Sequence, residues 1–132
     1  MSLKVGLIGC SNTALKNFIP LVTASDFTKL GFIASRSSTK AQDWARKFHC
    51  ESFGSYDEIV ESNVDLIYMP LPIGLHEKWI IKAAKSGKHI LCEKSSTTSY
   101  KSAKKITKVC KENDVRILEA FSYRFHPQHE HV

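Results

Sequence analysis

Residues 3–20 read LKVGLIGCSNTALKNFIP, and this stretch decides the fold class of the chain. Val5-Gly6-Leu7-Ile8 is a short apolar run beside a glycine, which is typical of a buried parallel strand. The apolar residues that follow recur at three- and four-residue steps, and they are Ala14, Leu15, Phe18, Ile19 and Val22. This spacing predicts a helix that Ser11 or Asn12 caps and that Pro20 bends. The stretch therefore predicts a strand, a tight turn and a helix.

The rest of the chain repeats this alternation. Apolar runs predict strands at 30–34, 66–69, 89–92 and 115–120, with a weaker candidate at 50–53. Amphipathic spacing predicts helices at 41–48, 56–61, 79–84 and 100–113. The fold class expected is α/β, a Rossmann-like doubly wound parallel sheet of about six strands with helices on both faces. A chain of 132 residues has the size of one domain.

Composition narrows the function classes. The chain has 42% apolar and 24% charged residues, an ordinary globular balance, and no apolar run reaches the roughly 18 residues that cross a bilayer. Without a signal-peptide pattern, the protein is expected to be soluble and cytoplasmic. The four cysteines are far apart with no C-x-x-C pair to indicate zinc, and they predict buried reduced thiols in preference to disulfides. The net charge of +6 comes partly from lysines at helical spacing in 101–111, which predict a solvated helix face. No aromatic residues interleave with these lysines, so no nucleic-acid partner is expected.

The turn after the first strand is a candidate phosphate site. A helix N-terminus presents free amides and a partial positive charge to an anion. Gly9 permits the tight turn, Ser11 replaces the usual second glycine and adds a hydroxyl donor, and Ala14 is small enough for helix–strand packing. Asn12 and Thr13 complete the predicted cofactor-binding turn. The alternative is that Gly9 only ends a strand and Ser11 only caps a helix.

The residues after the second strand bear on which nucleotide would bind. Ser35-Arg36-Ser37 stands where an acidic residue would bond a ribose 2′-hydroxyl, and Arg36 would instead attract a 2′-phosphate. NADP is therefore predicted as the cofactor in preference to NAD. Two alternatives stay open, a methyltransferase of similar architecture and a surface arginine that only begins a helix.

Four segments together resemble one known family. They are GCSNTA, YMPLPIGLH, SGKHILCEKS and EAFSYRFHPQ, and in this order they resemble the Gfo/Idh/MocA family of glucose-fructose oxidoreductase and inositol dehydrogenase, in particular its sugar and dihydrodiol dehydrogenases. The resemblance implies hydride transfer between NADP and a hydroxyl- or carbonyl-bearing carbon of a sugar, polyol or dihydrodiol. It implies Lys94 as the catalytic residue, and it adds to the cofactor site Leu71, Pro72, His76, Glu93 and Lys94 itself. The chain departs from the family pattern at Ser95, where proline is usual, and at Ile73, where asparagine is usual.

The resemblance also implies a domain organisation. Residues 1–125 are expected to be an NAD(P)-binding Rossmann domain, and residues 126–132 the start of a link to a C-terminal substrate domain that the sequence lacks. Alone, the chain is expected to be inactive, and a full-length form is expected to act on a small-molecule substrate. A homo-oligomer is possible, and the sequence leaves open whether an exposed sheet face drives self-association. The histidines at 126, 129 and 131 are not expected to bind metal. The alternative function is a non-catalytic dinucleotide-binding sensor or interaction module.

Overall fold

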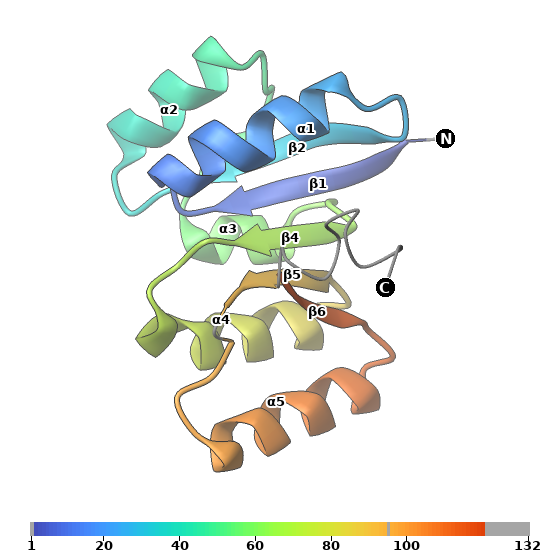
Figure 1. Ribbon diagram of the computed structural model, residues 1–132. Helices are drawn as coiled ribbons and strands as arrows, with labels where there is room; N and C mark the ends of the chain where they lie inside the picture. The colour runs from blue at the N-terminus through green and yellow to red at the C-terminus, as the bar shows by residue number, and fades with distance from the viewer. Residues whose placement is uncertain (1, 95, 121–132) are drawn as a thin grey trace, which may run out of the picture.

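The computed structural model describes residues 2–94 and 96–120 and shows one parallel sheet (Figure 1). The strands are β1 (Leu3–Ile8), β2 (Thr28–Ala34), β3 (Phe53–Gly54), β4 (Leu66–Met69), β5 (His89–Glu93) and β6 (Ile117–Ala120). Their order in the sheet is β3-β2-β1-β4-β5-β6, and every neighbouring pair is parallel. The strand order reverses between β1 and β4, where ligands of such sheets bind beyond the carboxyl ends of the strands. The predicted Rossmann-like doubly wound sheet is confirmed.

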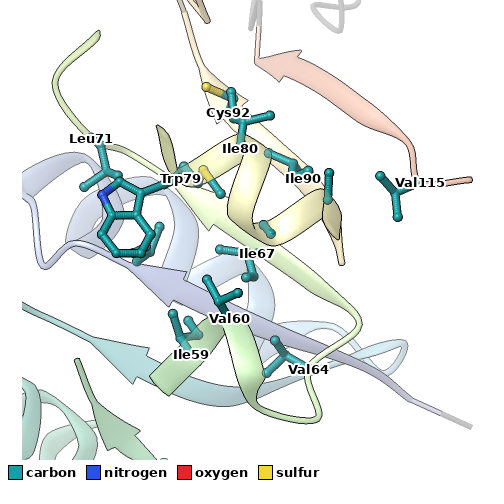
Figure 2. Close-up of a cluster of buried hydrophobic side chains, with 14 of the residues drawn as sticks. Ile59, Val60, Val64, Ile67, Leu71, Trp79, Ile80, Ile90, Cys92 and Val115 are labelled. Carbon is teal, nitrogen blue, oxygen red and sulfur yellow. The ribbon is translucent and has the colours of Figure 1, made fainter. Parts of the chain in front are cut away.

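Helices cover both faces of this sheet. They are η1 (Ala14–Phe18), α1 (Ile19–Ala24), α2 (Ser38–Lys47), α3 (Tyr56–Glu61), α4 (Ile73–Lys85) and α5 (Tyr100–Glu112). One hydrophobic core lies beneath η1, α1 and α2, and it contains Phe18, Val22, Ile33 and Tyr68. A second core lies on the other face beneath α3, α4 and α5, and Figure 2 shows part of it, including Ile59, Ile67, Trp79 and Cys92. The two cores account for the predicted helices on both faces.

The first helix is irregular next to Pro20. Its second section, α1, holds Pro20 in the first turn, and its first section, η1, is a π-helical turn in which the Ile19 amide donates to the carbonyl of Ala14. Proline has no N–H to give to the carbonyl four residues back, and such a gap in the ladder is where π-bulges and bends occur. The predicted effect of Pro20 therefore takes the form of a widened turn. The Phe18 ring at its end stacks on Tyr68 with the ring centroids 4.1 Å apart.

The elements that differ from the sequence prediction include α4 and β3, besides shifts of two or three residues at the starts of β2, α2 and β6. Helix α4 begins at Ile73, six residues before the predicted start at 79, because His76 is buried with 1% of its surface exposed and takes an apolar place in the helical pattern. Strand β3 has only two residues, Phe53 and Gly54, which pair with Ile33 and Ala34 at the edge of the sheet. The predicted domain boundary at 125/126, Ser95 and the three C-terminal histidines lie outside the described residues.

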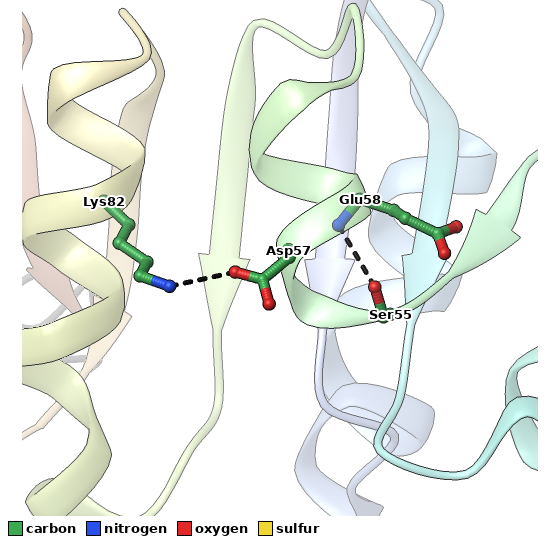
Figure 3. A network of polar contacts seen from close by, with 4 residues as sticks. All are labelled: Ser55, Asp57, Glu58 and Lys82. Atoms are coloured by element: carbon green, nitrogen blue, oxygen red, sulfur yellow. Dashed lines mark hydrogen bonds and ion pairs between the residues drawn. The ribbon is translucent and has the colours of Figure 1, made fainter.

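Polar contacts join α3 to its neighbours (Figure 3). The hydroxyl of Ser55 accepts a hydrogen bond from the amide of Glu58 at 3.2 Å and so caps α3. The Lys82 amine of α4 lies 2.9 Å from the Asp57 carboxylate of α3, but the two side chains are 44% and 73% exposed. Such an exposed pair contributes less than about 1 kcal/mol. The relative position of α3 and α4 therefore depends on the apolar core beneath them.

The α1 side of β4, β5 and β6 keeps an apolar hollow of about 350 Å³. Its lining includes Leu66, Leu91 and Leu118, and Leu118 is 49% exposed. Within residues 2–94 and 96–120, no helix combines the length and the apolar character that a membrane span needs.

Candidate functional site

The turn after β1 has a shape that requires glycine. Gly9 has a φ of +105°, which L side chains rarely adopt, and a Cβ placed there would lie 2.9 Å from Cδ2 of Leu71. The amide of Gly9 donates to the carbonyl of Ala34 at 2.9 Å, so the turn is also tied to the end of β2. Leu71 follows β4, and the close approach therefore brings together the ends of β1 and β4 at the reversal point of the strand order.

Ser11 caps the helix that leaves this turn. Its Oγ accepts from the amide of Ala14 at 3.1 Å, and its carbonyl accepts from the amide of Leu15 at 3.1 Å. The hydroxyl hydrogen of Ser11 stays available as a donor because Oγ uses a lone pair for the cap. Asn12 and Thr13 are exposed and lie in the first turn, where amides have no helical carbonyl before them. The predicted phosphate turn thus combines two first-turn amides with one hydroxyl.

Ala14 is the small residue that the turn needs for close packing of the helix on the strand. Ala14 has no exposed surface, because it packs into the core beneath η1. A larger side chain would push the helix away from β1. This small residue therefore keeps the helix N-terminus close to the end of the strand.

Arg36 lies beside the turn. Burial raises the pKa of the Tyr56 hydroxyl, while the positive charge of the nearby Arg36 guanidinium acts in the opposite direction. The same hydroxyl oxygen is 3.7 Å from the position that a Cβ of Gly9 would take. The guanidinium therefore stands next to the turn, in the place where a 2′-phosphate was predicted to bind.

Ser35 and Ser37 shape the end of β2. Ser35 is buried and accepts from the amide of Ser37 at 3.1 Å. Ser37 caps α2 by accepting from the amide of Lys40 at 3.2 Å. Both serines therefore use their side-chain oxygens to hold the backbone around Arg36.

Lys40 is a second cation at this place that the sequence analysis did not identify. Burial raises the pKa of the Cys10 thiol, and the nearby Lys40 charge and a hydrogen bond with Ser35 oppose that rise. Lys40 therefore lies near the turn, although in the sequence β2 and the residues after it separate Lys40 from that turn. Its sequence signal is its position in the first turn of α2, the helix that Ser37 caps directly after Arg36.

The end of β5 carries the predicted catalytic residue. Lys94 is exposed directly after Glu93, and among residues 2–94 and 96–120 no hydrogen bond or ion pair engages its amine. Tyr68 of β4 donates its hydroxyl to Oε1 of Glu93. Burial, that hydrogen bond and the Glu93 charge all raise the pKa of Tyr68, so it remains a donor. The carboxylate beside Lys94 is therefore held by the neighbouring strand.

The residues predicted around α4 occupy different environments. Leu71 is buried against Gly9, whereas Pro72 is exposed at the start of α4 and Ile73 is 41% exposed. The His76 ring is buried between α4 and β5, with Nδ1 3.2 Å from Sγ of Cys92 and 3.2 Å from the carbonyl oxygen of Ser96. The structure thus joins Leu71 to the turn and places the His76 ring inside the fold.

The strand order sets the distances between these groups. Arg36 follows β2, Gly9 follows β1, Leu71 follows β4 and Lys94 follows β5, and these four strands are adjacent in the sheet. With neighbouring parallel strands about 4.8 Å apart, the four ends form one rim about 14 Å long. The Arg36 guanidinium lies at one end of the rim, the Gly9 turn lies in its middle and the Lys94 amine lies at the other end. Within the described residues, no cluster of three His, Cys, Asp or Glu side chains could hold a metal ion.

This rim can be compared with known proteins. Residues 3–121 match the model of a family described as an oxidoreductase family with an NAD-binding Rossmann fold, GFO_IDH_MocA. The chain belongs to the Gfo/Idh/MocA family. The resemblance inferred from the four sequence segments is therefore confirmed.

Curated relatives in this family act on sugars. The dTDP-3,4-didehydro-2,6-dideoxy-alpha-D-glucose 3-reductase of Actinomadura kijaniata is 36% identical over 131 residues, which is 98% of this chain and 40% of the relative. The D-xylose 1-dehydrogenase (NADP(+)) 2 of Haloferax volcanii is 37% identical over 124 residues, 92% of this chain and 38% of the relative. The chain thus spans about 40% of the length of these Gfo/Idh/MocA relatives.

Solved structures agree with the assignment. A 3-ketoreductase from Actinomadura kijaniata, solved with NADP, has a TM-score of 0.94 at 35% identity, covering 99% of this chain and 42% of the other. The scyllo-inositol dehydrogenase of Lactobacillus casei has a TM-score of 0.88 at 21% identity, covering 98% of this chain and 39% of the other, and shows likeness in fold alone.

Proposed function

We propose that this chain is the NADP-binding part of an oxidoreductase. The enzyme would transfer a hydride to or from a hydroxyl- or carbonyl-bearing carbon of a sugar, polyol or dihydrodiol. The observation that carries the proposal is the placement of the Arg36 guanidinium beside the Gly9 turn, with no acidic residue directly after β2. Two of the relatives named above support it: the xylose dehydrogenase has NADP in its name, and the 3-ketoreductase was solved with NADP.

The residues present fit such a cofactor. A Cβ at Gly9 would enter the turn and meet Leu71, so the glycine keeps the backbone open to a diphosphate. The diphosphate would be bound by the first-turn amides of Asn12 and Thr13 and by the Ser11 hydroxyl. Arg36 and Lys40 would bind the 2′-phosphate, Arg36 with its planar fork of donors and Lys40 as a point charge.

At the other end of the rim, Lys94 is placed to act on the substrate. Bound NADP(H) supplies or accepts the hydride. The exposed Lys94 amine would donate a hydrogen bond to the substrate oxygen and stabilise the negative charge that develops there. Glu93 is held by Tyr68, so the carboxylate is kept in place beside the lysine. The proposal has further parts. The substrate would be a small molecule, the protein would be cytoplasmic without a nucleic-acid partner, and copies of it would associate at the apolar hollow.

The proposal is tested by titrating the purified chain with NADPH and NADH and following the fluorescence of the reduced nicotinamide. A charge-assisted hydrogen bond contributes about 1.5–3 kcal/mol, which corresponds to a preference for NADPH of roughly 10- to 100-fold. Arg36→Ala is expected to remove most of this preference. Arg46→Ala is the matched control, since Arg46 is exposed in the last turn of α2, the helix that begins two residues after Arg36. Lys94→Ala should keep NADPH binding within a few-fold.

Two results would contradict the proposal. The absence of binding by either nucleotide at millimolar concentration would remove the dinucleotide site altogether. Equal affinity for NADH and NADPH, unchanged by Arg36→Ala, would leave a dinucleotide site but remove the assignment of NADP.

A further inference from the structure

The backbone of Ser96, two residues after Lys94, is held on both sides. Its amide donates to Oε1 of Glu119 at 2.6 Å, and its carbonyl oxygen lies 3.2 Å from Nδ1 of His76. Glu119 belongs to β6 and His76 to α4, so three separate segments meet at the backbone of one residue. We call this arrangement the Ser96 clamp. It lies in the connection between β5 and α5, which begins with Lys94 and ends at the α5 cap, Ser99.

The surroundings of the clamp define which atoms donate. Burial raises the pKa of Cys92 to about 12, and the charges of Glu119 and Glu93 act in the same direction, so the thiol keeps its proton. That thiol donates to the carbonyl of Glu93 at 3.4 Å. The Nδ1 hydrogen of His76 is then the donor to the Ser96 carbonyl, and Sγ of Cys92 can receive part of it as a weak acceptor.

The clamp is shielded from water on its histidine side. His76 is 1% exposed and Cys92 is fully buried, whereas Glu119 is partly exposed. Hydrogen bonds in such surroundings are stronger than in water, and breaking one leaves a costly unpaired group. The acceptor on the Ser96 amide is a carboxylate, and hydrogen bonds to charged groups are the stronger kind. The position of Ser96 is therefore well determined by the fold.

Lys94 itself has no such restraint. Among the described residues its amine forms no hydrogen bond or ion pair, and its side chain is long and flexible. The direction in which Lys94 leaves the sheet depends on the backbone on either side of it. Before it, Glu93 pairs with Ala120 in the sheet. After it, Ser96 is the first described residue whose backbone is held.

We propose that His76 and Glu119 are positioning residues, which hold the chain at Ser96 so that Lys94 points from the end of β5 toward the cofactor and substrate. This inference rests on the proposed function of Lys94. It gives His76 a role different from the direct cofactor contact that the family resemblance implied. Because the backbone is held at Ser96 as well as at Glu93, fewer directions are available to Lys94.

The test compares Glu119→Ala, Glu119→Gln and a control, Glu112→Ala. Gln has nearly the same size as Glu and keeps an acceptor oxygen. Glu112 is an exposed residue of α5, and its carboxylate lies 3.9 Å from the Lys108 amine. Three quantities are measured on each full chain: hydrogen exchange of the Ser96 amide by NMR, the rate of Lys94 acetylation with and without NADPH, and the affinity for 2′,5′-ADP. The last ligand carries the adenosine-side phosphates only and therefore reports on the Gly9 turn without involving Lys94.

Glu119→Ala is expected to speed exchange of the Ser96 amide by about 10- to 100-fold, since it removes a bond to a charged acceptor. The same variant should lose most of the protection that NADPH gives to Lys94, while its affinity for 2′,5′-ADP stays within about two-fold of the original. Glu119→Gln should restore most of both properties, and Glu112→Ala should change neither. His76→Phe, which keeps a ring but removes the donor, should behave like Glu119→Ala, and His76→Asn should restore the donor.

The outcomes separate the two proposals. If 2′,5′-ADP and NADPH do not bind the unaltered chain, the proposed function is wrong and the positioning role falls with it. If both bind and Glu119→Ala speeds Ser96 exchange but leaves Lys94 protection unchanged, the clamp has only a structural role and the inference is overturned. Unchanged exchange and protection in Glu119→Ala overturn it as well. The Glu119 series decides the question even if the buried His76 variants fail to fold.

Discussion

Replacing Gly9 by alanine should destabilise the fold and damage the phosphate turn together. At a φ of +105° an L residue has a strained backbone, at a cost of about 1–3 kcal/mol. The added Cβ would also lie 2.9 Å from Cδ2 of Leu71, and moving that flexible side chain out of its preferred rotamer costs about 0.5–1.5 kcal/mol more. We therefore expect Gly9→Ala to lower the free energy of unfolding by about 2–4 kcal/mol.

Gly87→Ala is the matched control. Gly87 also has a positive φ, +77°, but no atom lies within 4 Å of the position of its Cβ. Only the backbone term applies there, so the loss should be about 1–2 kcal/mol. The measurement is urea denaturation followed by circular dichroism, combined with an NADPH titration of each variant. Gly9→Ala should bind NADPH at least ten-fold more weakly, because a displaced turn no longer directs its amides at the diphosphate, and Gly87→Ala should bind normally.

The reasoning about the turn would be refuted by one pattern of results. If Gly9→Ala and Gly87→Ala lose the same stability, the close approach to Leu71 has no energetic consequence. If Gly9→Ala also binds NADPH like the unaltered chain, the turn is not the phosphate site. The comparison needs no knowledge of the substrate, since both measurements are made on the chain itself.

Three other predictions concern stability alone. Above pH 9.0 the unfolded chain loses the Cys92 proton that the folded chain keeps until about pH 12. The free energy of unfolding should therefore fall by up to about 1.4 kcal/mol per pH unit in that window. Urea midpoints at pH 8, 9 and 10 measure this slope, and Cys92→Ala should reduce it. Asp57→Asn, which removes the exposed pair with Lys82, should cost less than about 1 kcal/mol, and 1 M salt should abolish the difference; a larger, salt-independent loss would contradict this. Gly74→Ala in α4 should raise the free energy of unfolding by about 0.5 kcal/mol, because nothing lies within 4 Å of its Cβ position, and a lowered midpoint would show the backbone there to be strained.

Much of the fold could be predicted from the sequence because its signals are local. The apolar run before Gly9 and the helical spacing after it identified the first strand, turn and helix, and the same alternation identified a doubly wound sheet. The helix boundaries were predicted less well where a polar residue occupies a buried position. His76 has a polar side chain but occupies a buried place, and for that reason α4 was predicted to begin six residues too late.

By itself the sequence determined the element types, the residues of the turn and the presence of a cation in place of an acid after β2. Those properties depend on neighbours in the chain, through backbone conformation and periodic burial. Only the tertiary structure decided that Arg36 stands beside Tyr56 at the Gly9 turn, and that His76 and Glu119 meet at Ser96. Contacts between residues about twenty or more positions apart depend on strand order and helix packing, which no local pattern specifies.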